Sequence, residues 1–323
     1  MNHRVLIVGS SGYIGTNLVA FLNKLNIYEI LCCAKTEKFI NVSGCSKVFQ
    51  IKDITLVDNW SEILKGVDVV VYLVGIAHIK LKRNSENLYD AVNYKSAIKL
   101  AKASELQNVK RFIYISTIGV LGDRTEPGLF FTNSSQYNPQ NMYAVSKMKA
   151  EKHLENIAKT SLMKVVILRP PLVFGPKAPG NFRRIVNLTS YGIPLPLGAF
   201  THEKNMISVR NLSSIIEKCF SAPLGNFSKF IVSDDSKIST LELAISTAKY
   251  LNKKKLFFYM PLFLLRFLSN FIGYKNEIDK MSSELRIDSS ETRTLLNWKP
   301  LQSPNDGLKE AIISYKSNRK EKK

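Results

Sequence analysis

Hydrophobic residues recur with two different periods along the first half of the chain. Short, nearly continuous apolar runs rich in Val and Ile predict buried strands, and segments with helical periodicity follow them. The strand-like runs cover residues 4–9, 29–35, 67–75, 110–117 and 164–170. Helical periodicity covers residues 16–25, 88–105 and 142–158. Alternation of this kind predicts an α/β fold with a parallel, doubly wound sheet.

The pattern changes after residue 170. Residues 170–182 and 191–200 are dense in proline and glycine, which is typical of loops around a site. We therefore expect a first domain over residues 1–170 and a smaller α/β domain formed mainly by residues 171–323. Segments at roughly 205–235 are expected to interleave with the first domain. No internal repeat is visible.

Composition narrows the class of protein. The 323 residues are 45% hydrophobic, without an apolar run long enough to span a membrane and without a signal-peptide pattern at Met1. The four cysteines show neither metal-ligand spacing nor a disulfide framework. They are Cys32, Cys33, Cys45 and Cys219. We expect reduced thiols, no metal site and a cytoplasmic protein.

The formal net charge of +20 is large. Nucleic-acid binding is not favoured, because the basic residues are scattered apart from the tail at residues 316–323. An anionic substrate or an anionic membrane surface agrees with the charge equally well.

Three glycines join the first predicted strand to the first predicted helix. Gly9, Gly12 and Gly15 stand three residues apart, and Tyr13 and Ile14 lie between the second and the third of them. Glycine permits a tight turn, and the free N–H groups of a helix N-terminus attract a pyrophosphate. The spacing is one residue longer than the usual dinucleotide fingerprint. Its position after the first strand predicts a dinucleotide site.

The second strand indicates which dinucleotide binds. NAD sites usually carry an acidic residue at this strand end, whereas this chain has Lys35. A cation suits a 2′-phosphate, so NADP is favoured over NAD, although Lys35 could equally be a solvated surface residue. Asp53 could accept a hydrogen bond from the adenine amino group or could be a turn residue.

Tyr143 and Lys147 form the candidate catalytic pair. At i,i+4 on a helix the two side chains share one face, and a nearby ammonium lowers the pKa of a phenol. Such a tyrosine exchanges a proton with an alcohol oxygen. Tyr250 and Lys254 have the same spacing but lack the preceding strand that ends in hydroxyl residues. Thr117 ends that strand before Tyr143 and could hold the same oxygen.

These motifs together resemble the extended short-chain dehydrogenase/reductases, in the NAD-dependent epimerase/dehydratase family. The resemblance includes the glycines, Asp53, Asn93, "ISTIGVLG", "YAVSK", "LRPPLVFGP" and "LLNWKP". It implies a Rossmann domain that binds NAD(P) and a smaller domain that binds a nucleotide sugar. Further cofactor contacts implied by the resemblance come from Ile54, Val74, Gly75, Asn93 and Pro170.

Ile118 and Gly119 follow Thr117, where 4,6-dehydratases of this family resemble one another in carrying an Asp-Glu pair. A dehydratase is therefore disfavoured. The favoured interpretation is a 4-keto reductase of a UDP-4-keto-6-deoxy-N-acetylhexosamine in O-antigen or capsule biosynthesis. The alternative is a 4-epimerase of UDP-glucose or UDP-GlcNAc. A non-catalytic NADP-binding sensor is the third interpretation, from another class of protein.

On the substrate side, the resemblance places Asn181 at the sugar diphosphate. Lys204 stands where the family has a phosphate-binding arginine, and Arg210 replaces an aspartate of the same motif. His78 could border the nicotinamide site, although a histidine beside a strand end is more often structural. Homodimerisation through the Tyr143 helix is common in the family.

The apolar stretch 256–274 allows two interpretations. The favoured one is a helix that covers the substrate domain. The alternative is a contact with a membrane surface, which the basic charge would support.

Overall fold

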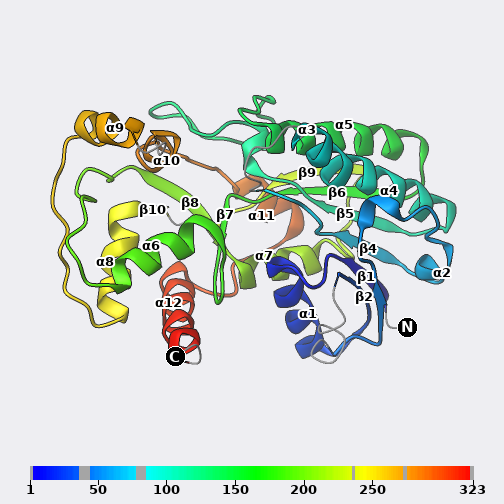
Figure 1. Cartoon of the computed structure of the whole chain (residues 1–323). Coiled ribbons are helices and arrows are strands. Elements are labelled where there is room, and N and C mark those ends of the chain that lie inside the picture. Colours follow the sequence, from blue (N-terminus) through cyan, green and yellow to red (C-terminus); the bar gives the residue numbers. More distant parts are fainter. Residues whose placement is uncertain (1–2, 36–43, 78–84, 235–236, 272–274, 321–323) are drawn as a thin grey trace.

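A computed structural model describes residues 3–35, 44–77, 85–234, 237–271 and 275–320. The larger part, on the right in Figure 1, is a parallel sheet with helices on both faces. The smaller part, on the left, contains a short second sheet and several helices. The large sheet has seven strands in the order β3-β2-β1-β4-β5-β6-β9. The chain therefore has the Rossmann-like α/β fold that the alternating pattern predicts.

The seven strands of the large sheet are β1 (His3–Val8), β2 (Tyr28–Ala34), β3 (Lys47–Gln50), β4 (Val69–Tyr72), β5 (Arg111–Ile115), β6 (Lys164–Arg169) and β9 (Phe227–Ile231). The small sheet contains β7 (Leu172–Phe174), β8 (Glu203–Ser208) and β10 (Lys237–Ser239). The helices of the larger part are α1 (Tyr13–Leu25), α2 (Ser61–Leu64), α3 (Ser85–Tyr89), α4 (Ser96–Leu106), α5 (Met142–Thr160), α7 (Val209–Lys218) and α11 (Ser290–Leu296). Those of the smaller part are α6 (Gly180–Ser190), α8 (Thr240–Tyr250), α9 (Leu262–Phe271), α10 (Lys275–Met281) and α12 (Pro304–Lys320).

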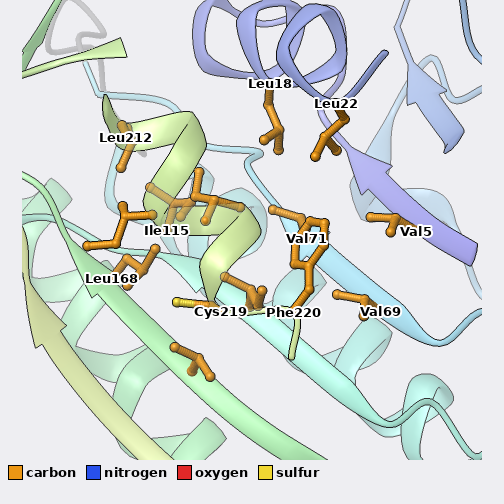
Figure 2. Packing of buried hydrophobic residues seen from close by; sticks show 14 of the residues in the cluster. Val5, Leu18, Leu22, Val69, Val71, Ile115, Leu168, Leu212, Cys219 and Phe220 are labelled. Atoms are coloured by element: carbon orange, nitrogen blue, oxygen red, sulfur yellow. The ribbon is translucent and has the colours of Figure 1, made fainter. Parts of the chain in front are cut away.

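Side-chain alternation along β1 explains why its sequence is apolar throughout. Val5 and Ile7 belong to the hydrophobic cluster under α1 and α7, part of which Figure 2 shows. Leu6 and Val8 point to the opposite face and join the cluster under α2, α4 and α5. A strand covered on both faces has no polar side, as is usual for parallel sheets.

Later segments of the chain return to the larger part. β9 pairs with β6 in parallel, and α7 packs against α1. Trp298, just after α11, is buried in the same cluster and donates its indole N–H to Ser214 Oγ at 2.9 Å. Interleaving therefore includes residues near 298 as well as the expected 205–235, and the division into domains at residue 170 stays an interpretation.

One expectation about the cysteines is wrong. Cys32 in β2 and Cys45, which precedes β3, form a disulfide. The two strands are parallel neighbours, so the backbone brings together residues that are thirteen positions apart. Spacing alone could not show this, because the bond depends on the parallel pairing of β2 with β3. Cys33 and Cys219 are buried free thiols.

Within the described part of the chain, every helix is too short or too polar to cross a bilayer.

Candidate active site

The glycine turn lies at the carboxyl end of β1 and is closely packed. Gly9 has φ +93°, a conformation that favours glycine. A Cβ on Gly15 would lie 2.3 Å from the Gly9 carbonyl oxygen, so no side chain fits there. Gly9 N and Ser10 N both donate to the Cys33 carbonyl at 3.1 Å, which ties the turn to β2. The bare backbone fits the close approach of a dinucleotide pyrophosphate.

Helix α1 begins directly after this turn. Its N-cap is Gly12, which provides no side-chain hydrogen bond to the first N–H groups. The N–H groups of the first turn, including those of Tyr13 and Ile14, therefore remain available for an anion. The Tyr13 hydroxyl is buried beside Gly175 and has no hydrogen-bond partner in the described structure. Both features fit a dinucleotide at this helix start.

Lys35 and Asp53 lie near the same turn. Lys35 is exposed at the end of β2, and its backbone N–H donates to Ser11 Oγ at 3.4 Å. Asp53 accepts from both the N–H and the hydroxyl of Thr55, which lowers the pKa of Asp53. Lys35 lowers this pKa further, although it is a smaller cause. Asp53 is therefore a turn-capping residue in this structure, and the adjacent Ile54 is half-buried.

Asn93 connects the segment after β4 to helix α5 through hydrogen bonds. It lies in a π-helical turn, Asp90–Lys95, and is fully buried. Its oxygen accepts from Ile76 N at 2.8 Å, and its amide nitrogen donates to Ile76 O and to Ser146 Oγ. Both amide donors are therefore used inside the protein, and Asn93 acts by positioning this segment. The segment includes Val74, which lies against Gly9, and the exposed Gly75.

The candidate catalytic side chains converge at the same edge of the sheet. Asn141 caps α5 by accepting from Ala144 N at 2.9 Å, which starts the helix one residue before Tyr143. One turn later, Lys147 donates to the Ile115 carbonyl at 2.8 Å. Its ammonium lies 3.3 Å from where a Cβ on Gly75 would be. The structure thus brings Lys147, Gly75 and the end of β5 together.

The pKa values differ from the sequence-based expectation. Burial raises the pKa of Tyr143 to about 12, and a hydrogen bond with Thr117 opposes part of that rise. The expected lowering of the Tyr143 pKa by Lys147 is therefore wrong in this structure, where burial is the largest influence on the phenol. Burial lowers the pKa of Lys147 to about 7, and Glu151 partly offsets this effect.

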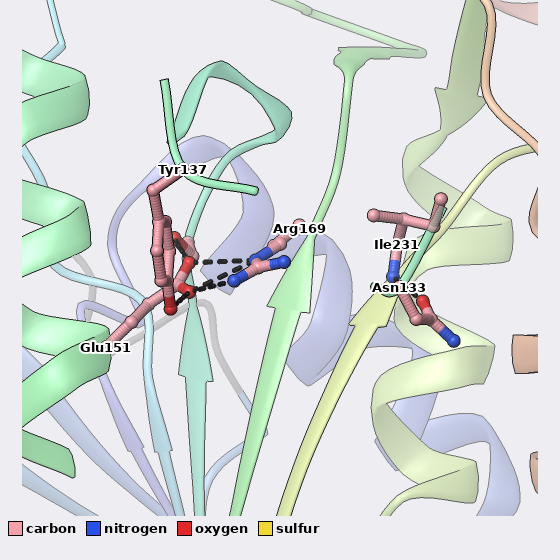
Figure 3. A network of polar contacts seen from close by, with 6 residues as sticks. Asn133, Tyr137, Glu151, Arg169 and Ile231 are labelled. Carbon is pink, nitrogen blue, oxygen red and sulfur yellow. Dashed lines mark hydrogen bonds and ion pairs between the residues drawn. The ribbon is translucent and has the colours of Figure 1, made fainter. Parts of the chain in front are cut away.

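A buried network behind the pair was missed by the sequence analysis. Glu151 lies one turn after Lys147 and forms an ion pair with Arg169 of β6, with 2.5 Å between Oε2 and Nη2. Ser116 and Tyr137 donate their hydroxyl protons to the same carboxylate. Figure 3 shows Tyr137, Glu151 and Arg169 in contact. The i,i+4,i+8 series from Tyr143 to Glu151 on one helix face could have indicated it.

The substrate-side residues are more dispersed. Asn181 is exposed in the first turn of α6, whose N-cap Pro179 supplies no side-chain bond. Lys204 in β8 donates to the Lys280 carbonyl and to Ser283 Oγ, and burial lowers its pKa to about 8. Its amine is therefore engaged within the smaller part.

Pro170 and His78 are the two remaining residues that the sequence analysis expected near the cofactor. Pro170 is buried, and its carbonyl accepts from Ile118 N at 2.9 Å, beside Thr117. His78 lies outside the described residues.

A glycine turn for a dinucleotide beside a Tyr-Lys pair defines the class of dinucleotide-dependent enzymes that act on alcohol or carbonyl groups. Residues 5–189 match the sequence model of the NAD dependent epimerase/dehydratase family. A UDP-glucose 4-epimerase of Vibrio cholerae is 34% identical over 98% of this chain and 96% of its own length. The chain belongs to the NAD-dependent epimerase/dehydratase family, as an extended short-chain dehydrogenase/reductase.

Two further similarities extend this result. An N-acetyl-alpha-D-glucosaminyl-diphospho-ditrans,octacis-undecaprenol 4-epimerase of Escherichia coli O157:H7 is 26% identical over 81% of this chain and 76% of its own length. The crystal structure of UDP-glucuronic acid 4-epimerase from Bacillus cereus in complex with NAD has a TM-score of 0.80 at 21% identity. That likeness covers 97% of this chain and 96% of that one, and it shows the fold. NAD, one of the two cofactors that the sequence left open, is the cofactor of the family.

Proposed function

We propose that this enzyme is an NAD-dependent 4-epimerase of a UDP-sugar, with UDP-glucose or UDP-GlcNAc as substrate. The observation that carries the proposal is the end-to-end similarity to a UDP-glucose 4-epimerase, together with the complete set of Thr117, Tyr143 and Lys147. The sequence analysis favoured a 4-keto reductase, and the relatives support its alternative instead. That preference rested on a resemblance of residues 169–243 to reductase-type proteins of polysaccharide clusters, and Lys35, as a sign of NADP, only supported it; the family itself is NAD-dependent.

The residues of the site agree with such a reaction. The chemistry that NAD supplies when bound is reversible hydride transfer with a carbinol carbon of the sugar. As a phenolate, Tyr143 would take the hydroxyl proton of that carbinol while the hydride leaves the same carbon, and would return the proton to the ketone oxygen after the sugar has rotated to present its other face. Thr117 holds the same oxygen through its hydroxyl. We propose that Lys147 binds the nicotinamide ribose, which its hydrogen bond to the Ile115 carbonyl and its proximity to Gly75 support.

Diphosphate recognition is proposed for the start of α6. Asn181 is exposed there, and the uncapped helix N-terminus favours negative charge. Arg183 and Arg184 are exposed one turn further on. Lys204 was the other expected diphosphate ligand, but its amine binds the Lys280 carbonyl, so we assign the first contact to Asn181.

The test uses the purified full chain with UDP-glucose and, separately, UDP-GlcNAc, with NAD present in catalytic amounts. Proton NMR follows conversion to the C4 epimer, and absorbance at 340 nm follows net NADH. Interconversion without net reduction of the cofactor supports the proposal. Stoichiometric NADPH consumption with a UDP-4-keto sugar, and no epimerisation, would restore the reductase interpretation. A chain that binds NAD without either activity would be the non-catalytic sensor.

A further inference from the structure

The most unusual surface of the molecule is the outer edge of the smaller part. After α8 the chain runs along this edge to α9, which lies at its upper left end in Figure 1. The large exposed apolar side chains of this edge are Ile193, Leu256, Phe258, Tyr259, Phe263, Leu264, Phe267 and Leu268. We call these residues the apolar edge. We propose that the apolar edge docks the enzyme on the surface of an anionic phospholipid bilayer.

Helix α9 exposes its large apolar side chains on its outer side. Its exposed side contains Phe263, Leu264, Phe267 and Leu268, with Phe263 73% exposed. Its inward side contains the buried Leu265 and Ser269. An ordinary surface helix turns its largest apolar side chains to the core and its polar ones to water. The reversed arrangement suits a helix that lies in the plane of a membrane interface.

The segment before α9 extends the same surface. Residues 256–258 pair with Leu195 through two backbone hydrogen bonds, Leu195 N to Leu256 O at 2.9 Å and Phe258 N to Leu195 O at 3.1 Å. These bonds hold the segment against the chain that follows α6, which contributes Ile193. Pro261 stands directly before α9, and its carbonyl accepts from the N–H groups of Leu264 and Leu265 in the first turn. Tyr259, which is 71% exposed, suits the headgroup level, where aromatic rings with a polar end accumulate.

The charge of this region decides what it binds. Residues 243–276 contain six basic residues and no acidic one, and because Arg266 is paired with Asp279 of α10 at 2.7 Å, the charge argument rests on the lysines. Lys253, Lys254 and Lys255 are exposed immediately before Leu256. Lysines beside an apolar interfacial surface attract anionic lipids. The same charge disfavours a second copy of this chain, because a symmetric contact through the apolar edge would place like charges together.

The inference is independent of the proposed reaction and of the active site. The test is co-sedimentation of the full chain with vesicles of phosphatidylglycerol and phosphatidylcholine, compared with vesicles of phosphatidylcholine alone. We expect binding to the anionic vesicles that weakens when the salt concentration rises, since an ionic strength of 1 M reduces the screening length to about 3 Å.

Two variants test the surface itself. Phe263→Ser combined with Leu268→Ser should raise the apparent Kd for anionic vesicles at least about tenfold, because two buried apolar contacts are lost. Lys253→Gln, Lys254→Gln and Lys255→Gln together should weaken binding roughly fivefold for each lysine.

The matched control is Leu106→Ser with Leu162→Ser, which removes two leucines of the larger part that are 80% and 98% exposed, more than Phe263 or Leu268. This control should bind vesicles like the unchanged chain. All variants should keep the unchanged rate with a soluble UDP-sugar, which also shows that they fold. Equal vesicle binding by the Phe263 and Leu268 variant would overturn the proposal. The absence of co-sedimentation of the unsubstituted protein with anionic vesicles would also overturn it. A dimer formed through the apolar edge, which the Phe263 and Leu268 substitutions dissociate, would overturn it as well.

Discussion

The buried ion pair between Glu151 and Arg169 predicts a large and specific loss of stability in Glu151→Gln. The two side chains are 0% and 1% exposed, and the carboxylate also accepts from Ser116 and Tyr137. Glutamine keeps the size of the side chain but leaves the Arg169 guanidinium buried without a counter-charge. Breaking a buried pair in this way costs about 3–5 kcal/mol of the free energy of unfolding.

Urea unfolding followed by circular dichroism measures this loss. With a slope of about 3 kcal/mol per molar urea, the midpoint should fall by roughly 1 M or more. The matched control is Asp58→Asn, which removes the partner of Lys99 from an exposed ion pair and should change stability by less than about 1 kcal/mol. If the two variants lost equal stability, burial would not set the strength of this pair and the reasoning would be refuted.

Three other predictions concern the turn, the lysine and the thiols. Gly15→Ala should abolish NAD binding in calorimetry and lower the free energy of unfolding by about 1–3 kcal/mol, because the added methyl group meets the Gly9 carbonyl. The control Gly225→Ala, whose added methyl group meets no atom within 4 Å, should change neither quantity. Equal effects of the two variants would contradict the close packing at the turn. Burial lowers the pKa of Lys147 from 10.5 to about 7, so between these pH values Lys147 is protonated in the unfolded chain and neutral in the folded one. The free energy of unfolding should therefore rise with pH in this range by up to about 1.4 kcal/mol per pH unit. Lys147→Met should remove this slope in urea unfolding at pH 7.5 and 9.5, and an unchanged slope would refute the assignment. Thiol titration should find no reactive cysteine in the native protein and two, Cys33 and Cys219, after unfolding. Unfolding in the presence of a reductant should expose all four thiols, because it also breaks the disulfide. Four reactive thiols after unfolding without reductant would exclude the disulfide.

Much of the larger part follows from local sequence pattern. β1 and β4 are apolar on both faces because helices cover both sides of the sheet. An uninterrupted apolar run such as Val69–Tyr72 therefore predicts a strand that is buried on both faces. Part of the glycine turn is equally local, since Gly9 has a positive φ and Gly15 lies against the backbone of Gly9 and Ser10. Such features are visible without knowledge of the rest of the chain.

The missed features depend on contacts between distant segments. Glu151 looks like an ordinary helix residue until β6 places Arg169 beside it. Lys204 was expected at a phosphate, but the chain near Ser283 folds back to receive its amine. The disulfide between Cys32 and Cys45 requires the parallel pairing of β2 and β3. Periodicity can place Glu151 on the helix face of Tyr143 and Lys147, but it does not identify the partner that a distant segment supplies.

The most direct measurement of the central claim is epimerisation by the Tyr143→Phe variant, with NAD binding measured on the same sample. Phenylalanine keeps the ring at the start of α5 and removes only the oxygen that exchanges the proton. The account predicts that turnover of the UDP-sugar falls by about 10²–10⁴-fold while the Kd for NAD changes less than about twofold. Turnover at the unchanged rate would show that another group moves the proton and would contradict the account.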